Sequence, residues 1–195
     1  MKILIVGAGG IGSNFVPELC NCLEQGQINS NTEIYVADDD LVELEQIKYQ
    51  NFTCEEAGMN KAEALAKRFK ACGVTAIKKM IMNGNDLKPY HIIILCVDNE
   101  PTREMVINYC FDKNKQFLDL RATGRIISAF PKFATREENL KFVDKEYNVS
   151  YSCQDEETLR QGMVDKGNKI VAYCGIQMLL NHLRGKRNRA ISLLI

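Results

Sequence analysis

The chain has 195 residues, of which 46% are hydrophobic and 26% charged, a composition typical of a soluble globular protein with a buried core. Its 25 lysines and arginines equal its 25 aspartates and glutamates, so no overall charge attracts nucleic acid or a membrane surface. We therefore expect no nucleic-acid partner and no membrane partner. The basic run formed by Arg184, Lys186, Arg187 and Arg189 is expected to be a solvated end of the chain.

The cysteine pattern bears on metal binding and on the cellular compartment. The eight cysteines include no C-x-x-C pair, which argues against a zinc ribbon and against a redox dithiol. The apolar run at the N-terminus is too short for a signal peptide, and no other run approaches membrane-spanning length. These features predict a protein with reduced thiols in the cytoplasm.

Apolar runs and helical periodicity alternate along the chain. Strands are expected at 2–6, 34–37, 74–81, 91–97, 116–123 and 125–130. Helices are expected from the first glycines to about residue 23, at 60–72, at 98–111 and at 168–185, with a short helix or turn at 43–50. Residues 131–166 are polar and show no regular pattern. The alternation predicts one α/β domain over residues 1–195, with a Rossmann-like, mostly parallel sheet and helices on both faces.

A glycine-rich turn follows the first expected strand and opens a helix. Gly7, Gly9, Gly10 and Gly12 permit a tight turn in which backbone N–H groups approach a phosphate at the positive end of the helix. Asp38 closes the second strand, where a carboxylate accepts hydrogen bonds from ribose hydroxyls. These features alone fit a dinucleotide-dependent enzyme as well as an ATP-dependent one.

An ordered set of further motifs follows the second strand. It comprises Asp38 and Asp40, Val42, Gln50, Gly58 with Lys61, and Asp98-Asn99 with Arg103. In this order the motifs resemble the ThiF/MoeB superfamily, the adenylating enzymes that activate ubiquitin-like and sulfur-carrier proteins. The resemblance covers roughly residues 2–130 and 167–185, and the combination is more specific than any single motif.

The chain departs from the family pattern at two motif positions. Gln46 stands where the family has an asparagine, and Tyr49 stands where it has an arginine that contacts the triphosphate. The chain also begins at its first strand, without the preceding helix that supplies a second arginine in the family. The zinc-binding C-x-x-C pairs of many relatives are absent as well.

The resemblance implies an ATP-dependent adenylyltransferase that acts on the C-terminal carboxylate of a ubiquitin-like or sulfur-carrier protein, as a homodimer or heterodimer. Its cofactors are ATP and Mg²⁺. Lys61 is implied to neutralise phosphate oxygens, and Asp98 is implied to be the metal ligand. Asp38 holds the ribose in this scheme, and Asp40 lies near the phosphates or the metal.

Five other residues have implied roles at the same site. Gln46, Gln50 and Asn99 are expected to contribute to the nucleotide pocket. Arg103 either lies at the site, as in the family, or caps or pairs locally. Cys153 lies where several relatives place a cysteine that forms a thioester or persulfide, but its acidic neighbours would raise the pKa of a nucleophilic thiol.

Two alternative functions remain open. A scaffolding or regulatory subunit of the ThiF type is favoured by Tyr49 and by the missing N-terminal arm. A nicotinamide-dependent oxidoreductase shares the glycine turn and Asp38, but it leaves Lys61, Gln50 and Asp98-Asn99 without a role.

Overall fold

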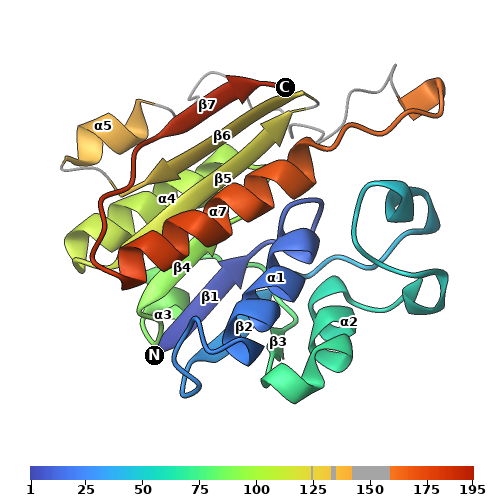
Figure 1. Ribbon diagram of the computed structural model, residues 1–195, viewed down its shortest axis with the longest axis horizontal. Coiled ribbons are helices and arrows are strands. Elements are labelled where there is room, and N and C mark those ends of the chain that lie inside the picture. The colour runs from blue at the N-terminus through green and yellow to red at the C-terminus, as the bar shows by residue number, and fades with distance from the viewer. Residues whose placement is uncertain (124, 133–134, 142–158) are drawn as a thin grey trace.

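The computed structural model describes residues 1–123, 125–132, 135–141 and 159–195. The described strands form one sheet in the order β3-β2-β1-β4-β5-β6-β7. Their bounds are β1 Lys2–Val6, β2 Glu33–Ala37, β3 Thr75–Ile77, β4 Ile92–Leu95, β5 Gln116–Thr123, β6 Ile126–Pro131 and β7 Ile191–Leu194. Strands β1 to β5 are parallel, whereas β6 and β7 are added antiparallel (Figure 1).

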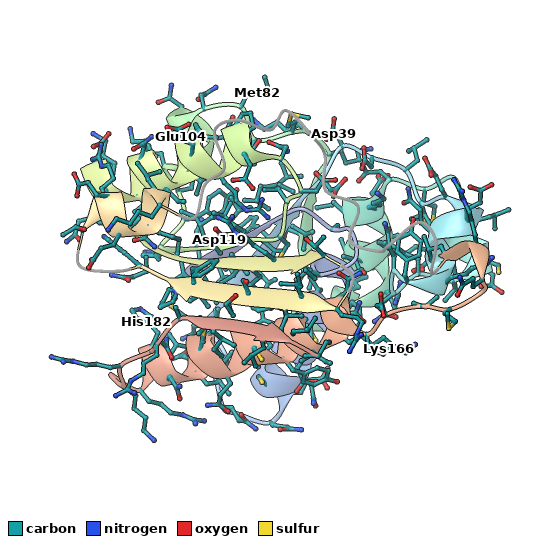
Figure 2. The ribbon with its side chains drawn as sticks, turned by 90° about the horizontal axis from the view of Figure 1, so that it is seen from above. Asp39, Met82, Glu104, Asp119, Lys166 and His182 are labelled. Atoms are coloured by element: carbon teal, nitrogen blue, oxygen red, sulfur yellow. The ribbon has the colours of Figure 1, made fainter. Side chains whose placement is uncertain are left out.

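Helices cover both faces of the sheet, which confirms the expected fold class. They are α1 Gly12–Glu24, α2 Lys61–Arg68, α3 Gly84–Leu87, α4 Glu100–Asp112, α5 Arg136–Leu140 and α7 Gly167–Leu183. Three short 3₁₀ turns are η1 Leu44–Lys48, η2 Cys54–Glu56 and η3 Lys70–Cys72. Figure 2 shows α4 on one side of the sheet and α1 with α7 on the other.

The alternation of side chains along β1 explains why both faces are covered. Ile3 and Ile5 belong to the core cluster that includes α1, α2 and α7, whereas Leu4 and Val6 belong to the cluster that includes α4. Successive side chains of a strand point to opposite faces, so a continuous apolar run requires apolar cover on both sides. Burial of β1 at the centre of the sheet follows directly.

The strand order places a crevice at the carboxyl end of β1. This strand pairs with β2 on one side and with β4 on the other, so the connections that leave it diverge. In an open α/β sheet such a switch point leaves a crevice outside the carboxyl ends of the strands, where ligands bind. The turns after β1, β2 and β4 all border this crevice.

Several elements differ from the sequence-based expectations. β3 ends at Ile77, because the chain turns there and the N–H of Lys79 donates to the Ile77 carbonyl. α2 ends at Arg68, and η3 continues its path to Cys72. β7 and α3 were not expected, since their apolar runs are short and only pairing or packing with distant residues stabilises them.

Two expectations concern surfaces. The basic residues between α7 and β7 are exposed, as expected, but their segment leads into a strand instead of forming a free end. Among the described residues, no helix combines the length and the apolar character needed to cross a membrane.

Candidate functional site

A polar cavity of about 440 Å³ lies at the switch point, outside the carboxyl ends of β1, β2 and β4. Most of the residues singled out from the sequence line it. They are Gly7, Gly9, Gly10, Asp38, Asp40, Gln46, Gln50, Lys61, Asp98 and Asn99. The structure therefore gathers residues from four separate stretches of the chain around one space. Gly12 and Arg103 do not line it.

The glycine turn allows the backbone to pass unusually close to its neighbours. Gly7 has a φ of +93°, and a Cβ atom there would lie 2.7 Å from the carbonyl oxygen of Cys96. A Cβ atom at Gly12 would lie 2.0 Å from the carbonyl oxygen of Gly7. α1 begins without a capping side chain and without an acidic residue in its first turn. The positive end of this helix is therefore free to interact with an anion.

Asp38 connects the glycine turn to the acidic segment after β2. Its two carboxylate oxygens accept hydrogen bonds from the N–H groups of Ala8, at 2.6 Å, and Asp40, at 2.9 Å. Burial disfavours the charged form and raises the pKa of Asp38, although these two hydrogen bonds act in the opposite direction. The cavity thus contains a fixed acceptor next to the glycine turn.

Lys61 occupies the first position of α2, and its side chain is only 5% exposed. Its Nζ lies 3.0 Å from Oδ2 of Asp40, whose own side chain is 68% exposed. A cation at the positive end of a helix is unfavourable, and a buried ammonium group needs a partner. Lys61 is therefore an unusual residue for a surface helix, and its partner can be approached from solvent.

Asn60 positions the lysine. Its side chain caps α2 by accepting from the N–H of Glu63, and its amide nitrogen donates to the carbonyl oxygens of Asp38 and Asp40 at 3.0 and 3.1 Å. The N–H of Lys61 also donates to the Asp40 carbonyl. One asparagine thus joins the acidic segment to the helix that carries Lys61. Nothing in the sequence pattern of this helix indicates the link.

Gln46, Tyr49 and Gln50 form the wall of the cavity contributed by η1 and the residues after it. The Oε1 atoms of Gln46 and Gln50 are buried and have no hydrogen-bond partner within the part of the chain that the structure describes. Buried acceptors of this kind are usually paired, so they are available to donors of a ligand. The N–H of Asn51 donates to Oγ of Ser13 and so holds this wall against α1.

Asp98 and Asn99 lie between β4 and α4. Asp98 is exposed and lines the cavity opposite the acidic segment. Oδ1 of Asn99 accepts from the N–H of Thr102 and caps α4, whose second residue is Pro101. The cap fixes the direction in which the turn carries Asp98 into the cavity.

Arg103 lies beneath this turn in a buried network. Its guanidinium group donates to Oδ1 of Asp119 at 2.9 Å, to Oε1 of Glu100 at 2.7 Å and to the Val97 carbonyl. Arg121 also pairs with Asp119, which points from β5 toward α4 (Figure 2). The structure thus shows the local pairing that the sequence left open for Arg103, and it leaves no part of the guanidinium group on the cavity wall.

Cys153 lies outside the described residues. Within the described residues, the carboxylates close enough to share a metal ion are Asp38, Asp39 and Asp40, a group that does not include Asp98. The metal-binding role of Asp98 therefore stays a prediction.

Several wall residues had no signal in the sequence. Met80, Ile81 and Thr102 line the cavity because of the turn after β3 and the start of α4. An apolar residue in a loop carries no chemical pattern that distinguishes a binding wall from a packed core. Met80 is 46% exposed, which is the sign that its side chain borders open space.

Comparisons with known proteins agree with this geometry. The ThiF family matches residues 1–189. MccB with N-formylated MccA has a TM-score of 0.76 at 19% identity, over 100% of this chain and 61% of that one. E. coli MccB with ATP has a TM-score of 0.73 at 18% identity, again over 100% and 61%. PaaA has a TM-score of 0.70 at 18% identity, over 100% and 64%.

The chain thus spans about three fifths of the length of these solved proteins. At such low identity the structural likeness establishes the fold. No curated protein sequence matches the chain.

The raised pKa of Asp38 predicts a specific pH dependence. The folded state binds the proton of the Asp38 carboxyl group more tightly than the unfolded state does. Protonation of Asp38 therefore stabilises the folded state most below the ordinary pKa of 3.8, and this stabilisation is lost as the pH rises through the pKa of Asp38 in the folded protein. We expect the free energy of unfolding of the wild type, minus that of Asp38→Asn, to fall over this window and then level off. Urea denaturation across the pH range measures it, and a difference that is constant or rises with pH would contradict the assignment.

The Arg103 network predicts a large loss of stability on truncation. Arg103→Met leaves the buried carboxylates of Glu100 and Asp119 with Arg121 as their remaining cation, and we expect a loss of about 3 kcal/mol or more in urea denaturation. Arg136→Met is the matched control, because Arg136 pairs with Asp112 at the surface, and it should change stability by less than about 1 kcal/mol. Equal effects of the two substitutions would show that the network does not stabilise the fold.

Proposed function

Because the chain belongs to the ThiF family, we propose that it is an ATP-dependent adenylyltransferase. Its proposed substrate is the C-terminal carboxylate of a ubiquitin-like protein, a sulfur-carrier protein or a shorter peptide. The observation that carries the proposal is the presence of Lys61, Asp98, Asp38 and the glycine turn around one cavity. The solved complexes of MccB with ATP and with MccA support both a nucleotide and a peptide ligand.

The polar groups that line the cavity are complementary to those of a nucleotide. Gln46 and Gln50 have unpaired buried acceptors, the glycine turn lacks side chains that would fill the space, and α1 presents its positive end. Asp38 is placed to accept hydrogen bonds from ribose hydroxyls, as carboxylates at the end of the second strand do in related folds. The exposed Asp98 carboxylate is the proposed ligand of Mg²⁺, a cation that prefers oxygen ligands.

The proposed reaction needs positive charge at the phosphates. A carboxylate oxygen attacks the α-phosphorus, the bond to the bridging oxygen breaks, and pyrophosphate leaves with its electron pair. Because an anion attacks an anion, preorganised cations and N–H donors lower the barrier. Lys61 is held in place by burial, and its partner Asp40 is exposed, so phosphate oxygens can share or replace this contact. The N–H groups of the glycine turn add further donors.

A second candidate function is a ThiF-type scaffold or regulatory subunit. The specific observation in its favour is Tyr49, which lines the cavity where the family motif has an arginine. A nicotinamide-dependent oxidoreductase is the third candidate, but it gives no role to the buried Lys61.

The proposed adenylation predicts loss of pyrophosphate exchange in two variants. Exchange of labelled pyrophosphate into ATP is measured with the small proteins encoded beside the gene as carboxylate donors. We expect Lys61→Met and Asp98→Asn each to reduce the exchange rate by about 100-fold or more. Lys61→Met removes the cation proposed to contact the phosphates, and Asp98→Asn removes the carboxylate proposed to hold Mg²⁺. Lys67→Met is the control, since Lys67 is an exposed lysine of the same helix and should leave the rate unchanged.

Nucleotide titrations separate the three candidates. Binding of ATP with Mg²⁺ together with exchange supports the adenylyltransferase. Absence of binding of both ATP and Mg²⁺ favours the scaffold, and preference for NADH over ATP favours the oxidoreductase. Either of the last two results would contradict the proposed function.

A further inference from the structure

A second polar cavity, of about 200 Å³, lies behind the wall formed by Tyr49 and Gln50. These two residues line both cavities, so a single layer of side chains separates them. The other side of the second cavity is formed by residues 164–169, at the start of α7. This helix packs beside α1, and both helices direct their N-termini toward the carboxyl end of the sheet (Figure 1).

Asn168 is the unusual residue of this cavity. It is 1% exposed, and neither its Oδ1 nor its Nδ2 has a hydrogen-bond partner among the described residues. Its amide packs against the glycine turn so closely that a Cβ atom at Gly10 would lie 2.2 Å from Nδ2. A buried carboxamide with both ends unpaired is rare in folded proteins and calls for a partner that supplies an acceptor and a donor.

The charge around Asn168 indicates the sign of that partner. Among the described residues, three lysines and one carboxylate line the cavity, namely Lys48, Lys166, Lys169 and Asp165. α7 has no capping side chain at its start and no acidic residue in its first turn, so the positive end of a 17-residue helix faces the same space. Excess positive charge and free N–H donors favour an anion.

We propose that the cavity around Asn168 is an oxyanion subsite, separate from the nucleotide cavity, that binds a compact phosphate or carboxylate group. Nδ2 of Asn168 and the lysines supply donors to the anionic oxygens. Oδ1 accepts from a donor that the same ligand carries, which is a hydroxyl on a partly protonated phosphate or the N–H beside a peptide carboxylate. The subsite places an anion next to Tyr49, the position where the family's phosphate-binding arginine is absent.

Asn168→Leu distinguishes a ligand-binding residue from a structural one. Leucine has nearly the same shape and removes two unpaired polar atoms, so the unliganded variant should melt at the same temperature as the wild type or higher. Anion binding should fall at least tenfold. A lower melting temperature together with unchanged binding would show that Asn168 has a purely structural role.

Calorimetric titration of inorganic pyrophosphate tests the subsite directly. The titration uses the Lys61→Met background, so that binding in the nucleotide cavity is weakened and the result does not depend on adenylation. We expect one pyrophosphate to bind, with affinity lost in Asn168→Leu and reduced several-fold in the double variant Lys166→Gln/Lys169→Gln, whose positions are exposed and safe for folding. Lys67→Gln, outside both cavities, should have no effect.

A second titration identifies the source of the anion. Acetyl-Gly-Gly is compared with its C-terminal amide, which lacks the carboxylate. Binding of pyrophosphate alone supports the subsite and assigns it to phosphate. Binding of acetyl-Gly-Gly but not of its amide supports the subsite and assigns it to carboxylate. Absence of binding by both probes, or binding that neither Asn168→Leu nor the double lysine variant weakens, would overturn the proposal.

Discussion

The arrangement of the site depends on one buried cation. Lys61 stands at the first position of α2, where the helix dipole opposes a positive charge, and its side chain is almost entirely removed from water. The exposed Asp40 is its carboxylate partner, and Asn60 ties the backbone of Asp38 and Asp40 to the same helix. Burying Lys61 at this helix end costs free energy, and a more highly charged anion than Asp40, approaching from the cavity, would offset that cost. The proposed triphosphate is such an anion.

The fold supplies the rest of the positive potential through its backbone. Parallel strands direct the N-termini of α1 and α7 to the same edge, and neither helix has an acidic residue in its first turn. Gly10 allows the two helix starts to approach closely, because its missing side chain leaves room for Asn168. The proposed nucleotide and oxyanion sites therefore share one electrostatic origin. Their separation rests on Tyr49 and Gln50.

The sequence was sufficient for features that depend on local pattern. The apolar run of β1 with the glycines after it, and the apolar run of β4 before Asp98, predicted the strands and the turns of the cavity. It was insufficient where distant residues decide the structure. β7 forms because it pairs with the free edge of β6. Arg103 points inward because its guanidinium group pairs with the buried carboxylates of Asp119 and Glu100. The i,i+3 spacing within α4 is compatible with the Glu100 pair, but no spacing rule reveals Asp119 or the free edge of β6.

The proposed role of Asn168 could not be predicted from the sequence either. An asparagine near the start of a helix is an ordinary cap or surface residue in sequence. Only the packed structure shows that its amide is buried against Gly10 with both ends unpaired. Met80 and Ile81 reached the nucleotide cavity in a similar way, through the early end of β3. Residues of this kind become visible when burial and hydrogen-bond partners are known.

The central claim is that a triphosphate lies over the glycine turn, between Lys61 and Asp98. A crystal structure with a non-hydrolysable ATP analogue and Mg²⁺ tests it most directly. We expect phosphate oxygens within hydrogen-bonding distance of Nζ of Lys61 and of the N–H groups after Gly7, with the metal ion on a carboxylate oxygen of Asp98. A nucleotide bound elsewhere, or one whose phosphates point away from both Lys61 and Asp98, would contradict the account.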